Sequence, residues 1–400
     1  MDIVIIAQFC GDVENIENNN SRFLYLGKLL SAENEVEIIT TDFLHGTKRH
    51  FVGRHEYGGC KITQLHECGY PTNICLRRFK SHHELSVNVR QYLGARKKPD
   101  VIYCAVPSLD VAHAAAKYAQ KNGIRFIVDV QDLWPEAFTM VFNVPLIGSL
   151  AFYPMKLEAN YIYGAADEIV AVSQTYADRA LRVNKKCREA HSVFLGTDLS
   201  DFDRFRDENS VQKPKDEIWI AYIGTLGASY DLTSVIEALA VLKRKGKTIL
   251  KFIVMGDGPR KAEFEALANQ TGICSEFTGM LPYPKMVGRL CSCDIAINPI
   301  TKGAAQSIIN KVGDYAAAGL PVVNTQECLE YRNLIDKYHC GINCQNSNVG
   351  QLADALSKLV ENVAMRKQMG DSNRRLAEER FDRAASYGAL AELILKRSTT

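Results

Sequence analysis

Short apolar runs rich in valine and isoleucine alternate along the chain with amphipathic stretches of helical length. This alternation is typical of βα units whose parallel strands are buried on both faces of a sheet. The strands predicted in the first half are Ile3–Phe9, Val36–Thr40, Val101–Val106, Arg125–Val130, Glu168–Val172 and Ser192–Leu195. Those predicted in the second half are Ile218–Ile223, Leu250–Met255, Glu276–Thr278, Ile295–Ile300 and Pro321–Asn324.

Two segments interrupt this alternation. Residues 49–79 are less regular and contain Gly58-Gly59 and Pro71, which predicts a hairpin or a loop excursion. Residues 200–217 are polar and charged, as expected for an exposed linker. The chain is therefore predicted to be an α/β protein of two doubly wound, Rossmann-like parallel-sheet domains, at residues 1–199 and 218–380. In such sheets, ligands bind beyond the carboxyl ends of the strands.

Length and composition agree with this organisation. A chain of 400 residues exceeds what one hydrophobic core usually fills, and its net charge of +2 argues against a nucleic-acid partner held by phosphate contacts. The start of the chain lacks a basic signal-peptide region, and no apolar stretch approaches the ~20 residues of a membrane-spanning helix. We therefore expect a cytoplasmic protein. The 12 cysteines lack paired zinc-site spacing, so we expect them to be structural and predict no metal site.

Two glycine-bearing turns directly follow predicted strands in the second half. Gly224–Ser229 follows the strand that ends at Ile223, and Gly256–Pro259 follows the strand that ends at Met255. Small residues let backbone N–H groups approach an anion, and the N-terminus of the next helix adds about half a positive charge. Each turn alone is as often a tight connection as a phosphate site. Together, two turns on neighbouring strands would open onto the same crevice.

The segment from Pro299 to Val323 carries the most chemistry. A strand ends in a polar loop with Lys302, and a helix is predicted to start near Ser307 and to stop at Gly319-Leu320-Pro321. This helix would direct its N-terminus, with Lys302 and Lys311, at a diphosphate leaving group. The alternative is a solvated helix with two surface lysines.

At this point the chain resembles the retaining GT-B glycosyltransferases of family 4, especially the bacterial enzymes of capsule, exopolysaccharide and O-antigen assembly. The resemblance covers nearly the whole chain and is carried by Asp129–Glu136, Phe194–Asp198, Gly256–Pro259 and, most specifically, Asn310–Val323. It implies two domains that face a central cleft, an acceptor-binding first domain and a second domain that holds a nucleotide-activated sugar. It also implies that the linker is a hinge, with residues 381–400 crossing back to the first domain.

The family places two acids, spaced as Glu-x7-Glu, beside the donor. The second position is Asp314 here, which keeps an acceptor for ribose hydroxyls, whereas the first is Gln306, an amide that supplies no negative charge. Many members also hold the diphosphate with an arginine and a lysine after the first glycine turn, where this chain has Tyr230 and Asp231. Lys302 or Lys311 would then have to substitute.

These considerations predict three groups of site residues. The catalytic candidates are Asp132, Lys302 and Lys311, although an acid such as Asp132 can also be a helix N-cap. The donor-binding candidates are Gly224, Thr225, Gly227, Gly256, Gly258, Gly279, Met280, Gln306, Ser307 and Asp314. The acceptor-binding candidates are Gly11, Asp12, Asn20, Arg22 and Trp134, although a polar loop after a first strand is as often an ordinary surface loop.

The predicted activity is transfer of a hexosyl-type sugar from a nucleotide-diphosphate donor, a UDP-sugar, to a lipid-linked saccharide. Retention is implied by the family, and no cofactor or metal is expected because no Asp-x-Asp motif follows a strand. Basic clusters at Arg77–Lys80 and Arg96–Lys98 suggest peripheral contact with the inner leaflet, although a solvated face is an equal alternative. The rival hypotheses are a sugar-nucleotide 2-epimerase and a non-catalytic GT-B partner subunit.

Overall fold

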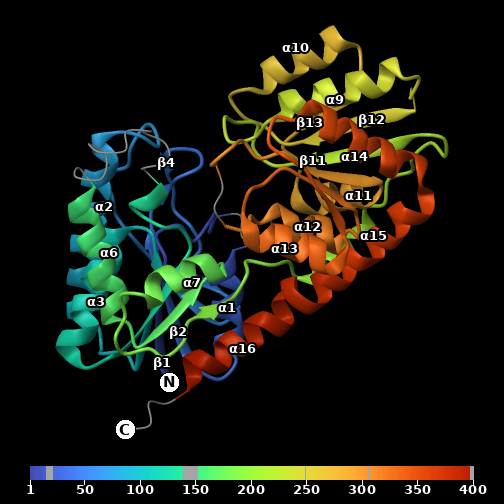
Figure 1. The fold of residues 1–400 in the computed structure, drawn as a ribbon. Helices are drawn as coiled ribbons and strands as arrows, with labels where there is room; N and C mark the ends of the chain where they lie inside the picture. The colour runs from blue at the N-terminus through green and yellow to red at the C-terminus, as the bar shows by residue number, and fades with distance from the viewer. Residues whose placement is uncertain (15–20, 138–151, 248, 305–306, 397–400) are drawn as a thin grey trace. The chain divides into compact units, whose positions relative to one another are not determined.

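The computed structural model describes residues 1–14, 21–137, 152–247, 249–304 and 307–396. The chain divides into two compact units, shown in Figure 1. Domain 1 is Met1–Phe194 together with the segment that starts at Ala385, and domain 2 is Leu195–Ala384. Each domain is built on its own sheet, flanked by helices on both faces. The predicted fold class, with two Rossmann-like α/β domains, is confirmed.

The sheet of domain 1 has the strand order β10-β9-β8-β7-β1-β2-β6-β5. All neighbouring strands are parallel except for the β5–β6 pair. The winding direction reverses between β1 and β7, which makes their carboxyl ends the topological switch point. The strands are β1 (Asp2–Ile6), β2 (Glu35–Thr41), β5 (Glu56–Tyr57), β6 (Cys60–Leu65), β7 (Val101–Val106), β8 (Arg125–Val130), β9 (Glu168–Ala171) and β10 (His191–Ser192), with a separate hairpin of β3 (Phe43–Leu44) and β4 (Arg49–His50).

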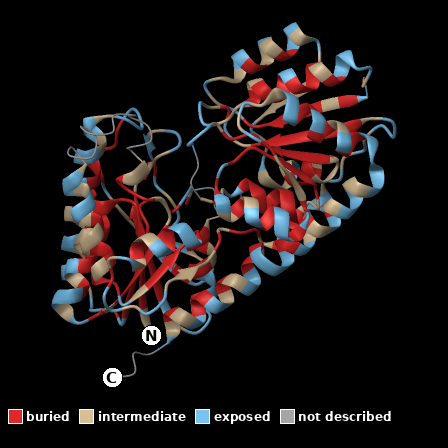
Figure 2. Ribbon diagram, viewed as in Figure 1, coloured by how far each residue is buried: buried red, intermediate tan, exposed pale blue. Residues whose placement is uncertain are grey.

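Helices cover both faces of this sheet (Figure 1). Phe23 and Leu26 of α1 share a buried core with Leu390 and Ile394 of α16 and with the strands of the sheet, which Figure 2 shows as buried. This packing explains why the C-terminal segment groups with domain 1. The helices are α1 (Arg22–Leu30), α2 (Leu76–Ala95), α3 (Leu109–Asn122), α6 (Tyr153–Ala165), α7 (Gln174–Leu181) and α16 (Arg383–Leu395).

The irregular segment at residues 49–79 contains more structure than its composition indicates. The expected hairpin is present, because Gly58 and Gly59 have positive φ and connect β5 to β6. However, β6 also pairs in parallel with β2, and α2 begins at Leu76. Strand β6 lies near the edge of the sheet and is only partly buried, so its residues are a mixture of polar and apolar types. It therefore lacks the continuous apolar run by which the other strands were predicted.

The sheet of domain 2 is entirely parallel, with the order β13-β12-β11-β14-β15-β16. This is the order 3-2-1-4-5-6 that characterises dinucleotide-binding Rossmann folds. The switch point therefore lies at the carboxyl ends of β11 and β14. The strands are β11 (Ile218–Ile223), β12 (Leu250–Met255), β13 (Cys274–Gly279), β14 (Ile295–Asn298), β15 (Val322–Asn324) and β16 (Gly341–Asn343).

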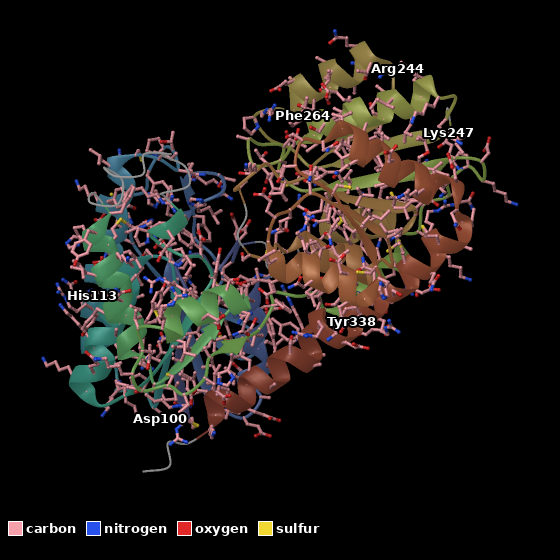
Figure 3. The ribbon with its side chains drawn as sticks, in the orientation of Figure 1. Asp100, His113, Arg244, Lys247, Phe264 and Tyr338 are labelled. Carbon is pink, nitrogen blue, oxygen red and sulfur yellow. The ribbon has the colours of Figure 1, made fainter. Side chains whose placement is uncertain are left out.

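The core of domain 2 forms where helices pack onto this sheet. Val235 of α9, Phe264 of α10 and Leu356 of α14 lie in one buried cluster with Ile220 and Phe252 of the strands, and Phe264 is labelled in Figure 3. The helices are α8 (Leu199–Glu208), α9 (Leu232–Arg244), α10 (Lys261–Thr271), α11 (Tyr283–Cys291), α12 (Lys311–Ala317), α13 (Leu329–Tyr338), α14 (Val349–Glu361) and α15 (Val363–Leu376), followed by a π-helical turn, η2 (Ala377–Phe381).

Two local predictions for domain 2 differ from the structure. The charged segment expected to be a linker contains helix α8, which Asp198 caps through the backbone N–H of Asp201 and which Arg204 stabilises by pairing with Asp201 and Glu208. The helix expected near Ser307 begins instead at Lys311, and the carbonyl of Ser307 accepts a hydrogen bond from the side chain of Gln326 at 2.6 Å.

Candidate functional site

The two glycine turns of domain 2 lie in backbone contact. The N–H of Gly224 donates to the carbonyl of Met255 at 3.0 Å, and the N–H of Leu226 donates to the carbonyl of Asp257 at 2.8 Å. A Cβ atom on Gly256 would lie 1.8 Å from the carbonyl oxygen of Gly224, so no larger residue fits there. The two turns therefore lie side by side, and the expectation that they open onto one crevice stays a prediction.

The loop that follows β14 closes the other side of the switch point. Asp231 N–H donates to Pro299 O at 2.9 Å, and Thr301 N–H donates to Ser229 O at 3.0 Å. The hydroxyl of Thr301 also donates to Ala228 O at 2.9 Å. The loops after β11 and β14 are thus tied together at the position where Rossmann sheets bind ligands.

Lys311 directs its unpaired terminal amine at the first of these turns. The residue is only 8% exposed, and its Nζ lies 3.9 Å from the ring centroid of Tyr230 and 4.1 Å from that of Tyr222. No hydrogen-bond partner or carboxylate contacts Nζ within the described part of the chain. Burial lowers the pKa of Lys311 well below its usual value. The sequence alternative of a solvated surface lysine is therefore wrong for this residue.

Gly224 and Lys311 constrain each other. A Cβ on Gly224 would lie 3.1 Å from Lys311 Nζ, and the φ of Gly224 is +121°, a conformation that glycine alone adopts readily. A residue with a side chain at position 224 would therefore push the turn away from Lys311 Nζ, and glycine allows the close approach. The result is a terminal amine beside the backbone of the turn, where a phosphate would favour the charged form of the lysine.

Asp314 lies one turn after Lys311 on α12 and is buried. Its Oδ1 accepts hydrogen bonds from the hydroxyls of Tyr283, at 2.8 Å, and Thr197, at 3.0 Å. Burial raises the pKa of Asp314, while Tyr283, Thr197 and Arg383 oppose this rise. Both hydrogen bonds fall on Oδ1, so Oδ2 keeps its capacity to accept from ribose hydroxyls. Thr197 lies within a stretch that resembles the family, whereas nothing in the sequence singled out Tyr283.

The remaining donor-binding candidates of domain 2 occupy varied positions. Met280, at the end of β13, is 82% exposed, and Gly279 before it has positive φ. Thr225 is exposed, and its carbonyl accepts from the hydroxyl of Tyr222. Lys302 is exposed, and no described contact joins it to the Gly224 turn. Gln306 lies outside the described residues.

Arg22 of domain 1 does not have the exposed position expected of an acceptor-binding residue. It is buried, and its Nε and Nη2 donate to the two carboxylate oxygens of Asp129 at 2.8 and 3.4 Å. Tyr103 donates to the same carboxylate at 2.6 Å, and Arg22 Nη1 donates to Val193 O. Burial alone would lower the pKa of Arg22, but Asp129 reverses the effect and raises it. Arg22 thus forms an internal ion pair with Asp129, and its role at an acceptor stays a prediction.

Asp132 lies just beyond the carboxyl end of β8 and is partly exposed. Its carboxylate accepts from the N–H of Leu133 at 2.9 Å, from the hydroxyl of Tyr176 at 3.4 Å and from Trp134. Burial raises the pKa of Asp132, and these hydrogen bonds together with the charge of Arg78 oppose the rise. A bond from the next residue is not the N-cap pattern, in which the donor lies two or three residues further along.

Trp134 is the centre of a cluster that the sequence did not reveal. The guanidinium carbon of Arg78 lies 4.7 Å from the Trp134 ring centroid, and the imidazole of His82 stacks on Trp134 at 5.7 Å. In the sequence, Arg78 belongs to the basic cluster Arg77–Lys80, and His82 lies two residues beyond that cluster. Their spacing of four residues on α2, which places both on one helix face, was the signal that could have found them.

The other acceptor candidates form a turn after β1. Gly11 has a φ of +94°, and Asp12 Oδ1 accepts from the N–H of Glu14 at 2.9 Å. Asn20 lies outside the described residues. The contacts of Gly11 and Asp12 are local, so their role at an acceptor stays a prediction.

A groove of about 610 Å³ runs along α2 and α3. Its lining includes Arg90, Asp110 and His113, which is labelled in Figure 3, and it includes none of the predicted site residues. Within the described ranges, no helix is long and apolar enough to cross a membrane. All 12 cysteines are free thiols.

Comparison with known proteins connects this geometry to a family. Residues 203–376 match the family model described as "Glycosyl transferases group 1". The "Putative colanic acid biosynthesis glycosyl transferase WcaI" of Escherichia coli is 25% identical over 248 residues, which are 58% of this chain and 58% of that protein. The "Uncharacterized glycosyltransferase MJ1069" of Methanocaldococcus jannaschii is 22% identical over 235 residues, 58% of this chain and 59% of that protein. The matches thus span less than two thirds of either relative.

Similarity to solved structures extends over the whole chain. The Anabaena protein Alr3699/HepE, solved in complex with UDP and glucose, superposes with a TM-score of 0.69 at 15% identity and covers 99% of this chain and 100% of its own. At this identity the match establishes the fold. The comparisons therefore support a group 1 glycosyltransferase domain over residues 203–376 and show that the chain has the GT-B fold of two Rossmann-like domains.

Proposed function

We propose that this chain is a retaining, metal-independent glycosyltransferase that moves a hexosyl group from a UDP-sugar, bound by domain 2, to a lipid-linked saccharide, bound by domain 1. The observation that carries the proposal is the buried, unpaired terminal amine of Lys311 beside the Gly224 turn, whose protonated form a bound diphosphate would favour. The family match over residues 203–376 supports it, and the UDP bound to the similarly folded HepE supports a nucleotide of this kind.

The chemistry follows from the position of Lys311. When the bond to the sugar breaks, negative charge develops on the departing diphosphate and positive charge on the sugar. An ammonium in a site with little water acts on that charge more strongly than it would in bulk solvent. The rings of Tyr222 and Tyr230 hold Nζ in place before the donor arrives, so little reorganisation accompanies the reaction.

Other residues of domain 2 take supporting roles in this proposal. Oδ2 of Asp314 accepts from the ribose hydroxyls, and the exposed side chain of Met280 packs against the base. Lys302 extends from its loop to the outer phosphate oxygens.

The decisive experiment measures nucleotide binding and then turnover. UDP and UDP-sugars should raise the unfolding midpoint, because a ligand that binds only the native state stabilises it. Lys311→Met should weaken this effect, whereas Lys285→Met, at an exposed lysine of the same domain, should not. Release of UDP only when a saccharide acceptor is added supports transfer.

Three outcomes would contradict the proposal. Failure to bind any nucleotide would remove the donor site. Conversion of the donor sugar without an acceptor would show a 2-epimerase. Binding of UDP-sugar with no turnover on any lipid-linked acceptor would indicate a non-catalytic subunit.

We also propose that domain 1 docks peripherally on an anionic leaflet through the start of α2. Ile74 and Leu76 are 60% and 86% exposed, and the exposed basic side chains of Arg77 and Lys80 follow them. Apolar side chains flanked by cations suit insertion between acidic headgroups. Leu76→Asp should reduce sedimentation with anionic vesicles, while Leu329→Asp, at a leucine of domain 2 that is 74% exposed, should not. Equal sedimentation of both variants would exclude this surface.

A further inference from the structure

A cationic cluster in domain 1 has a composition that the donor chemistry does not explain. We call it the Arg78 cluster, and its members are Phe9, His45, Tyr70, Arg78, His82 and Trp134. The guanidinium carbon of Arg78 lies 4.7 Å from the ring centroid of Trp134, 5.5 Å from that of Tyr70 and 6.0 Å from that of Phe9. These rings come from segments far apart in sequence, so the fold assembles the cluster.

Arg78 forms no ion pair among the described residues, and the charge of Asp132 acts on it only over a longer distance. Its Nη1 donates to Asn73 O at 2.9 Å, and Tyr70 is a further hydrogen-bond partner, but no described carboxylate lies within 4.0 Å of it. Its Nε is buried without a partner. A guanidinium in such surroundings normally pairs with an acid, because loss of hydration is costly for an unpaired charge. The unfilled donor therefore indicates a place for an anion from outside the chain.

A second polar atom of the cluster is also unpartnered. His82 is 2% exposed, and its Nε2 has no hydrogen-bond partner. Its ring packs against Trp134 and, edge-on, against Phe9. Burial, reinforced by the charge of Arg78, lowers the pKa of His82 to about 3, so the imidazole is neutral at physiological pH. A neutral imidazole can donate to an anion through one ring nitrogen without adding a second charge.

We propose that the Arg78 cluster binds an oxyanion carried by the acceptor, either the carboxylate of an acidic sugar or a phosphate that links the saccharide to its carrier. The inference rests on the proposed assignment of the acceptor to domain 1. The planar guanidinium fork matches either group, and the aromatic rings hold the fork and limit its contact with water. Arg78 is thus a specificity-determining residue that selects charged acceptors over neutral ones.

The test uses the fluorescence of Trp134. Because the chain has only two tryptophans, Trp219→Phe leaves Trp134 as the sole reporter, and saturating UDP occupies the donor site of domain 2. The probes are inorganic diphosphate, methyl glucuronide and the neutral methyl glucoside. We expect a saturable emission change with at least one anionic probe and none with the glucoside. Tighter binding of diphosphate would identify the oxyanion as the linking phosphate, and tighter binding of glucuronide would identify it as the carboxylate of an acidic sugar.

Two variants isolate the role of Arg78. Arg78→Gln should weaken binding of the anionic probe by about 10–100-fold, the range for losing charge-assisted hydrogen bonds. Arg90→Gln makes the same change at an exposed position of the same helix and should leave the affinity unchanged. A circular-dichroism spectrum and an unfolding midpoint confirm that each variant is folded.

The result that would overturn the inference is equal response to the glucoside and the glucuronide, an unchanged affinity in Arg78→Gln, or no saturable response to any probe. Each of these leaves UDP binding by domain 2 untouched, so the inference can fail while the proposed function stands. Loss of UDP binding with retained anion binding would be the opposite result and would contradict the proposed function instead.

Discussion

Arg22 of domain 1 and Lys311 of domain 2 occupy comparable positions and have opposite surroundings. Each is the first residue of a helix, and each side chain is buried. Arg22 forms an ion pair with Asp129 at 2.8 Å, whereas no described carboxylate contacts the Lys311 amine, which lies beside two aromatic rings and the Gly224 turn. A cation that the protein has already neutralised cannot bind an anionic ligand strongly. The comparison shows that Arg22 is neutralised within domain 1, and it supports the proposal that Lys311 binds the donor.

Substitutions of Arg22 and of Lys311 should change the free energy of unfolding in opposite directions. Removal of one partner from a buried ion pair leaves the other charge uncompensated and is strongly destabilising. A buried cation without an ion-pair partner has lost its hydration, and among the described residues only the two aromatic rings compensate for that loss. Removing this cation should therefore increase the free energy of unfolding. Mutations at the two positions should therefore move stability in opposite directions, and only one of them should affect the donor.

The largest effect is expected for Arg22→Met. Asp129 would remain buried with Tyr103 as its hydrogen-bond donor but without its cation, so we expect a loss of about 3–5 kcal/mol in the free energy of unfolding. Denaturant titration measures it. The double variant Arg22→Met/Asp129→Leu should recover much of the loss, because both charges are then gone. A single variant as stable as the native chain would contradict the structural assignment.

The next largest effect concerns turnover in Lys311→Met. Methionine keeps most of the packing of the side-chain stem and removes the charge. If Nζ acts mainly on the charge of the departing diphosphate, turnover should fall about 10²–10³-fold while donor affinity falls less. Initial rates measure the loss of turnover, and calorimetry measures the loss of donor affinity.

Lys302→Met gives the matched comparison, since Lys302 is exposed and lies on the neighbouring loop. We expect a smaller decrease in turnover for it than for Lys311→Met. Near-normal rates in both variants would show that backbone N–H groups alone hold the diphosphate.

A third measurement asks whether Asp314 binds ribose or only its own domain. Asp314→Ala should weaken UDP binding by about 1–3 kcal/mol, as expected for losing charge-assisted hydrogen bonds. Thr197→Val removes one internal hydrogen bond to Oδ1 and keeps the carboxylate, so it should change stability and spare UDP affinity. Equal affinity of the Asp314→Ala and native proteins in calorimetry would restrict Asp314 to a structural role.

The smallest effect is the stability of the free Lys311→Met protein, which should rise by about 1 kcal/mol at neutral pH once the lost cation–π attraction is deducted. Burial lowers the pKa of Lys311 in the folded state below its unfolded value of about 10.4. Between the two values the unfolded chain binds more protons, so the stability of the native protein should rise with pH. Unfolding at about pH 7 and about pH 9 should show this rise in the native protein and a smaller one in Lys311→Met. The same slope in both proteins would mean that Lys311 is not buried in solution.

The sequence determined the fold class and much of the donor region. Apolar runs identified β7, β8, β11 and β12 with their bounds, because strands buried on both faces leave a continuous local signal. The glycine turns at Gly224 and Gly256 were visible for a related reason, since a turn that touches another backbone excludes side chains. Strands and turns whose cause lies within a few neighbouring residues could therefore be predicted from the sequence.

Only the tertiary structure decided which charged residues are neutralised. Arg22 and Asp129 are 107 positions apart, and Trp134 is 56 positions beyond Arg78 in the sequence, so no local pattern joins either pair. In the sequence, Lys302 and Lys311 were equivalent candidates, and the fold buried one and left the other exposed. Whether a cation is paired, unpaired or solvated depends on which distant residues the chain brings within a few ångströms, because hydration and charge interactions both change steeply over that distance.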